Sequence, residues 1–104
     1  MTNRSTLILI AIFALSPFAL RAQTAADNYK SKCQMCHGTT GLGDSPMGKS
    51  MKVPPFNSPD LIKMSDADLI AATTNGKGKM PAYTGKLTAP QIKDLVAYIR
   101  TLQK

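Results

Sequence analysis

The sequence predicts an all-α protein with one small domain. Three segments place apolar residues at helical spacing, and a residue that can cap a helix precedes each of them. No stretch alternates apolar and polar residues for long enough to predict a strand. The chain has 104 residues, which is enough for one domain, and it contains no internal repeat.

The N-terminal residues 1–22 have the layout of a secretory signal peptide. A short basic start, MTNR, precedes sixteen uncharged residues, STLILIAIFALSPFAL, and small residues follow. Cleavage is predicted after Ala22, with Ala25 and Ala26 as alternatives. An uncleaved membrane anchor is the competing interpretation, but the run is shorter than the roughly 20 residues that span a bilayer. The domain is therefore predicted to cover 23–104, in the periplasm.

The charge of the chain restricts its partners. Thirteen basic residues oppose six acidic ones, all aspartates, and two basic residues leave with the predicted signal. The remaining net charge of +5 suits nucleic acid, an acidic membrane or an acidic protein. Export argues against nucleic acid. A mature chain of 82 residues also buries only a modest core, so a bound group is expected to stabilise it.

The first predicted helix covers about 24–37. Thr24 can cap its start, and Asp27 follows three residues later, as in a capping box. The second helix covers about 65–75, where Ser65 is the predicted cap and Gly76 the stop.

The third helix has the clearest signals. Thr88 and Gln91 match a capping box, and Pro90 lies in the first turn. One apolar stripe follows, made of Ile92, Leu95, Val96, Ile99 and Leu102. A shorter helix is predicted over 58–63, with Ser58 as its cap.

Between the first two main helices, residues 38–57 predict a loop without a helix. This stretch, GTTGLGDSPMGKSMKVPPFN, holds four glycines and three prolines. A loop of about twenty residues is unusual in so small a domain unless something packs beneath it. A flat, largely apolar cofactor would supply that packing.

The motif CQMCHG contains both cysteines and the only histidine of the chain. If the first helix continues through residue 37, Cys33, Cys36 and His37 project from one side. Cys-x-x-Cys-His is the attachment signature of c-type haem, with two thioethers and one axial nitrogen. A zinc site would need a second pair of ligands, and a thioredoxin-like pair would need a βαβ setting. A plain disulfide remains the alternative.

A haem iron has a sixth position, and Met80 is the predicted ligand. It lies in NGKGKMPAYTG, where Gly76 and Gly78 give the backbone freedom to approach and Pro81 follows. A thioether is a soft ligand that favours Fe(II) and raises the reduction potential.

The other methionines are weaker candidates. Met35 lies between the cysteines on the wrong face of the helix, and Met64 ends the short helix, where a core position is expected. Spacing alone leaves Met47 and Met51 open, as it does water.

From about 24 to 103 the chain resembles small bacterial class I cytochromes c. CQMCHG matches the haem motif, and KMPAY is similar to the methionine-ligand segment. Ala25 and Tyr29 resemble the family's small-x-x-x-aromatic pattern on the first helix, with Ala25 where many relatives have glycine. Leu95 and Tyr98 resemble the last-helix residues that cross it.

The resemblance implies the class I cytochrome c fold, in which three main helices and a short one wrap one covalent haem. It implies attachment through Cys33 and Cys36, and axial ligation by His37 and Met80. It also implies a proline whose carbonyl accepts a hydrogen bond from the histidine. Pro46 is the preferred candidate, with Pro54 and Pro55 as alternatives.

The function that the resemblance implies is that of a monomeric electron carrier, not an enzyme. Lysines are expected to ring the exposed haem edge and to attract an acidic face of a redox partner protein, without direct contact to a membrane. They are Lys32, Lys77, Lys79 and Lys86. Two alternatives remain: a subunit fixed in a larger oxidase or dehydrogenase, and an open-site haem sensor or peroxidase-like protein.

Overall fold

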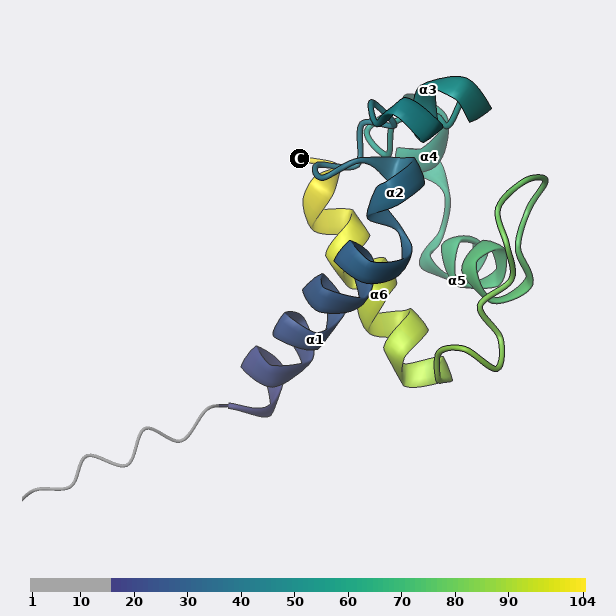
Figure 1. Ribbon diagram of the computed structural model, residues 1–104. Coiled ribbons are helices and arrows are strands. Elements are labelled where there is room, and N and C mark those ends of the chain that lie inside the picture. The colour runs from purple at the N-terminus through teal and green to yellow at the C-terminus, as the bar shows by residue number, and fades with distance from the viewer. Residues whose placement is uncertain (1–15) are drawn as a thin grey trace, which may run out of the picture.

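The computed structural model describes residues 16–104, and these residues fold as an all-helical domain (Figure 1). Two isolated bridges, and no strand, accompany the helices in this part of the chain. The all-α prediction is confirmed. The helices are α1 (Pro17–Lys32), α2 (Gln34–His37), α3 (Pro46–Met51), α4 (Pro59–Lys63), α5 (Asp66–Asn75) and α6 (Ala89–Leu102).

The domain is built around α6, the last helix. Figure 1 shows α1 crossing α6 and the α5 segment on the other side, while α2, α3 and α4 form the upper part of the molecule. The most deeply buried large side chains are Tyr29 from α1 and Ile92, Leu95 and Val96 from α6. Ala25 is also buried in α1, the helix that packs against α6.

The caps predicted for α5 and α6 are confirmed, whereas Ser58 precedes α4 without a side-chain capping hydrogen bond. Ser65 accepts a hydrogen bond from the backbone N–H of Asp68 at the start of α5, and Gly76 caps its end. Thr88 and Gln91 form both bonds of the capping box at the start of α6. These contacts span three residues, so local sequence determines them.

The predicted start of the first helix, at Thr24, is wrong. The helix begins at Pro17 with Ser16 as its cap, because this pair supplies a capping hydroxyl and a proline in the first turn. Thr24 lies inside α1, where its hydroxyl donates to the carbonyl of Leu20 at 2.9 Å. The helix is also interrupted at Cys33, so the motif lies on the short helix α2.

The signal-peptide prediction lies mostly outside the described residues, because the basic start and most of the apolar run precede residue 16. Helix α1 passes through the predicted cleavage point after Ala22. Within residues 16–104, none of the helices has the length and hydropathy of a bilayer span.

The prediction that 38–57 holds no helix is wrong, because α3 forms there. Ser45 accepts from the N–H of Gly48 at 3.0 Å and donates to the carbonyl of Met35 at 2.6 Å. Pro46 occupies the first turn of α3, and a proline occupies the first turn of α4 and of α6 in the same way. The glycines around Ser45 favour a loop in the sequence pattern, so the cap is not evident there. Contacts with α2 stabilise the short helix α3.

Candidate functional site

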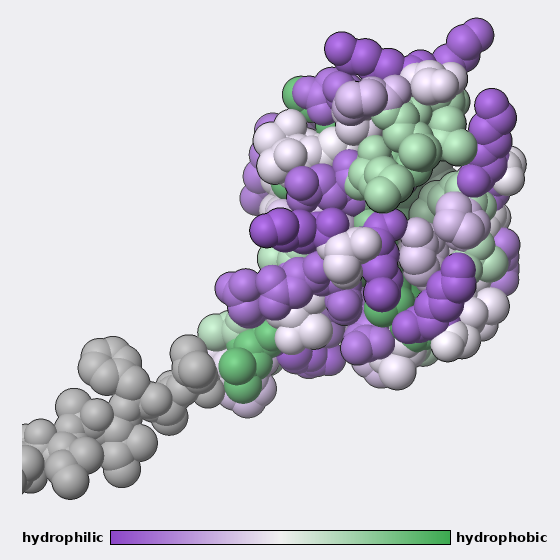
Figure 2. Space-filling view, viewed as in Figure 1, coloured by the Kyte–Doolittle hydropathy of each residue, from purple (hydrophilic) through white to green (hydrophobic). Residues whose placement is uncertain are grey.

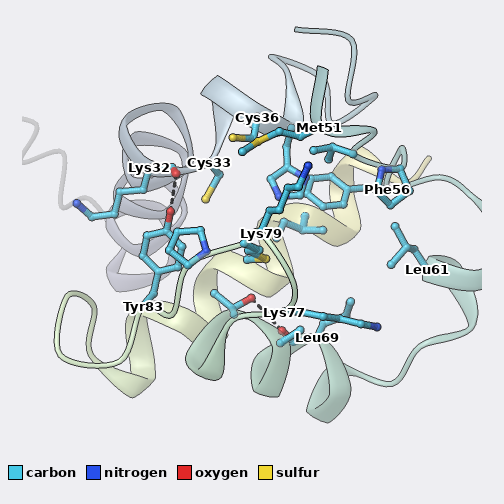
Figure 3. Close-up of a pocket in the computed structure, with 18 of the residues that line it drawn as sticks. Lys32, Cys33, Cys36, Met51, Phe56, Leu61, Leu69, Lys77, Lys79 and Tyr83 are labelled. Atoms are coloured by element: carbon cyan, nitrogen blue, oxygen red, sulfur yellow. Dashed lines mark hydrogen bonds between the residues drawn. The ribbon is translucent and has the colours of Figure 1, made fainter. Parts of the chain in front are cut away.

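The four candidate ligands line one cavity of about 520 Å³, and Figure 3 shows this cavity with Cys33 and Cys36 among its labelled residues. Cys33, Cys36 and His37 reach it from the end of α1 and from α2, and Met80 reaches it from the connection between α5 and α6. Most of the remaining wall is apolar, with side chains that include Val53, Pro54, Phe56, Leu61, Leu69, Ala72, Leu95 and Ile99. The structure therefore brings together residues more than forty positions apart in the sequence.

The motif is held by the turn between α1 and α2. The N–H of Cys33 donates to the carbonyl of Tyr29, and the N–H of His37 donates to the carbonyl of Cys33, both at 2.9 Å. Gly38 ends α2 with a φ of +83°, a conformation that suits glycine. The buried Tyr29 hydroxyl donates to the Gly38 carbonyl at 2.5 Å, which ties the end of the motif back to α1.

No disulfide joins Cys33 to Cys36, and Cys33 is the more buried of the two. Burial raises the pKa of Cys33 to about 11; Lys32 lowers it and Cys36 raises it further.

The imidazole of His37 packs flat against Phe56. The two ring centroids are 4.5 Å apart and the planes differ by 18°. Nδ1 is buried without a hydrogen-bond partner. Burial lowers the pKa of His37, which favours the neutral imidazole that binds metals. No local sequence pattern predicts the position of Phe56, because its contact with His37 joins residues nineteen positions apart.

Met80 lies on a tight turn. The N–H of Lys77 donates to the Met80 carbonyl at 3.1 Å, and the N–H of Met80 donates back at 3.0 Å. Gly78 has a φ of +57° within this turn. At Gly76 a Cβ atom would lie 2.7 Å from the Met80 carbonyl oxygen, so glycine permits the close approach. Gly76 and Gly78, which predicted backbone freedom in this segment, thus allow a specific hydrogen-bonded turn.

The remaining methionines divide into two groups. Met51 and Met64 line the cavity, whereas Met35 and Met47 do not. Met35 is 70% exposed and Met47 is 42% exposed. Met51 and Met64 are therefore the other two thioethers in the wall.

The three prolines that were candidates for the hydrogen bond with His37 lie in different places. Pro54 lines the cavity, while Pro46 begins α3 and is not part of the wall. The Pro55 carbonyl accepts a hydrogen bond from Ser58 at 3.1 Å. Of the three, only Pro54 shares the cavity wall with His37, but no carbonyl within residues 16–104 accepts a hydrogen bond from Nδ1 of His37, so the proline–histidine bond stays a prediction.

Three of the four expected lysines, Lys32, Lys77 and Lys79, line the cavity. Lys86 does not, and its ammonium lies 5.6 Å from the centroid of the Tyr83 ring. A further lysine, Lys52, lines the cavity from the end of α3, and no sequence pattern predicts it there. Figure 2 shows a hydrophobic, hollowed area on this side of the molecule, bordered by hydrophilic side chains.

Comparisons with known proteins agree with this geometry. Residues 20–99 match the family described as cytochrome C oxidase, cbb3-type, subunit III. The chain is 36% identical to cytochrome c6 of Gloeothece citriformis, covering 89% of this chain and 83% of that one. It is 29% identical to the cbb3-type oxidase subunit CcoP of Azospirillum brasilense, covering 90% of this chain but 32% of that one.

Among solved structures, the c-type cytochrome KustC0563 is similar to this chain, with a TM-score of 0.70 and 27% sequence identity. The similarity covers 77% of this chain and 98% of that one.

Proposed function

Because this chain belongs to the small class I c-type cytochromes, we propose that Cys33 and Cys36 attach its covalent haem c. The protein has the class I cytochrome c fold and is a haem c electron carrier. His37 and Met80 are the proposed axial ligands. The observation that carries this assignment is their convergence, with both thiols, on one largely apolar cavity.

The residues around the cavity account for the chemistry. A bound haem iron supplies a one-electron couple between Fe(III) and Fe(II). The His37 nitrogen and the Met80 sulfur would both hold the iron, which would leave no open ligand position for a substrate, and the protein is proposed not to be an enzyme. The soft thioether and the apolar side chains Leu69 and Leu95 favour Fe(II), because they stabilise added positive charge poorly.

Replacement of Met80 tests the axial assignment. In Met80→Ala the weak far-red band of methionine-bound ferric haem is expected to disappear, and the reduction potential to fall, because water or a nearby lysine is a harder ligand. Met47→Ala is the matched control, since Met47 lies outside the cavity. If Met51→Ala or Met64→Ala abolishes the band while Met80→Ala keeps it, the assignment is incorrect. A wild-type protein without the band would favour the open-site sensor or peroxidase-like function.

The lysines at the cavity support a docking face for an acidic redox partner. Lys32, Lys77 and Lys79 concentrate positive charge where electrons are proposed to leave, and such charge speeds encounter at low salt. The small anion hexacyanoferrate is a suitable probe. Lys79→Glu is expected to slow its electron transfer several-fold at low salt, whereas Lys93→Glu, on the exposed side of α6, leaves the rate nearly unchanged. Equal effects of the two variants would contradict the docking face.

The proposed location is the periplasm, after cleavage behind Ala22. Cleavage would remove the ion pair between Arg21 and Asp94, whose N–O distance is 3.3 Å. Both side chains are partly exposed, so this pair is worth only about 0–1 kcal/mol and the domain does not depend on it. The mass of the purified holoprotein checks the cleavage point, and a retained N-terminus would favour the membrane anchor.

A second candidate function is that of a subunit in a larger oxidase. The family match and the similarity to CcoP favour it, although the chain spans about a third of CcoP. Gel filtration of the native protein distinguishes the two candidates. The proposed free carrier elutes as a monomer, and a subunit elutes with its complex.

A further inference from the structure

The stack between Phe56 and His37 is the most specific contact that an axial-ligand candidate makes with another side chain. The planes are 18° from parallel at 4.5 Å, and Phe56 is 7% exposed. Parallel aromatic rings at this distance restrict each other's rotation, since turning one ring requires the other to move. The orientation of the His37 imidazole plane is therefore restricted by the neighbouring Phe56 ring.

Phe56 is itself held in place. The backbone N–H of Phe56 donates to the carbonyl of Gly41 at 2.8 Å, and the backbone carbonyl of Phe56 accepts from the side-chain amide of Gln103 at 3.0 Å. A Cβ atom on Gly41 would lie 2.4 Å from a ring carbon of Phe56, so glycine allows the ring to lie against the backbone. The Tyr29 ring lies nearby, with its centroid 6.4 Å away and its plane tilted by 59°. Phe56 is thus clamped independently of His37.

Orientation of a metal-bound histidine usually comes from a hydrogen bond to its second ring nitrogen. The Phe56 ring supplies a further restraint on the His37 imidazole, through contact with its face. We propose that Phe56 is a positioning residue that sets the imidazole plane of the axial histidine. The inference rests on the proposed ligation by His37.

The imidazole plane has a spectroscopic signature. In low-spin ferric haem, the orientation of the axial ligands directs the unpaired electron toward particular pyrrole rings. The shifts of the four haem methyl protons, and the electron paramagnetic resonance g-values, follow that direction. These quantities report orientation rather than stability or activity.

The test compares ferric holoproteins carrying Phe56→Leu, Phe56→Tyr and the control Leu87→Ala. Leu87 is buried in the core and is not part of the cavity wall, so its truncation weakens the fold without touching His37. Phe56→Leu is expected to change the spread or order of the methyl shifts and the g-values while the methionine band remains. Phe56→Tyr keeps the ring, and it is expected to restore the wild-type pattern.

A measurement on the wild-type protein makes the test independent of how the variants fold. In the diamagnetic ferrous form, nuclear Overhauser effects are expected between the Phe56 ring protons and the imidazole protons of His37. Their absence, or an unchanged methyl pattern in Phe56→Leu, overturns the inference while the proposed ligation stands. A wild-type spectrum without histidine–methionine ligation overturns both.

Discussion

Removing the Tyr29 hydroxyl should destabilise the holoprotein more than the same change at the other two tyrosines. The hydroxyl donates to the Gly38 carbonyl at 2.5 Å in a buried environment, and Gly38 directly follows His37. In Tyr29→Phe the ring remains, but the buried carbonyl is left without its partner. The cost of such a loss is about 1–3 kcal/mol.

The expected change in melting temperature follows from the size of the domain. For 60–100 residues, each kcal/mol corresponds to roughly 4–8 °C. A central cost of about 2 kcal/mol therefore lowers the melting temperature of Tyr29→Phe by roughly 8–16 °C. Thermal unfolding followed by circular dichroism on the holoprotein measures it.

The other tyrosines provide matched controls for the same chemical change. The Tyr83 hydroxyl donates to the Lys32 carbonyl at 2.8 Å in a partly buried position, where water can replace it, so Tyr83→Phe is expected to cost about 0.5–1.5 kcal/mol. No hydrogen bond of the Tyr98 hydroxyl occurs among residues 16–104, and Tyr98→Phe should stay within about 0.5 kcal/mol of wild type. Equal melting temperatures for the variants at Tyr29 and Tyr98 would refute the reasoning.

Two further predictions concern the haem and the tyrosines. Acid–acetone extraction should leave the haem on the chain, and Cys33→Ala or Cys36→Ala should sharply lower the holoprotein yield. The apoprotein should lose most of its helical circular dichroism, because the cavity wall would face water. A cooperatively folded apoprotein would contradict this dependence on haem. Burial raises the pKa of the Tyr29 and Tyr83 phenols, so the stability that the protonated phenols contribute is complete below about pH 10 and lost as pH rises through their higher folded values. Phenolate absorbance should therefore rise together with unfolding, and full ionisation of Tyr29 and Tyr83 near pH 10 in a folded protein would be inconsistent with that burial.

Short-range interactions explain which structural predictions succeeded. The capping box of Thr88 and Gln91 and the Ser65 cap depend on residues three positions apart, so their identities are enough to predict them. At α3 the Ser45 cap is equally local, but the glycines around it are typical of a loop, and the predicted loop is wrong there. At α1 an earlier cap, Ser16, was overlooked.

The all-α class and the haem motif can be predicted from the amino-acid sequence, because helix caps and Cys-x-x-Cys-His spacing are local properties. Which distant residues share the cavity depends on the path of the folded chain. Pro54 rather than Pro46 lines the wall, Lys52 joins the lysines there, and Phe56 stacks on His37. These placements depend on the path of 38–57, where positive-φ glycines turn the chain and close packing selects its neighbours. No local pattern encodes that path, because its energy comes from contacts between segments far apart in the sequence.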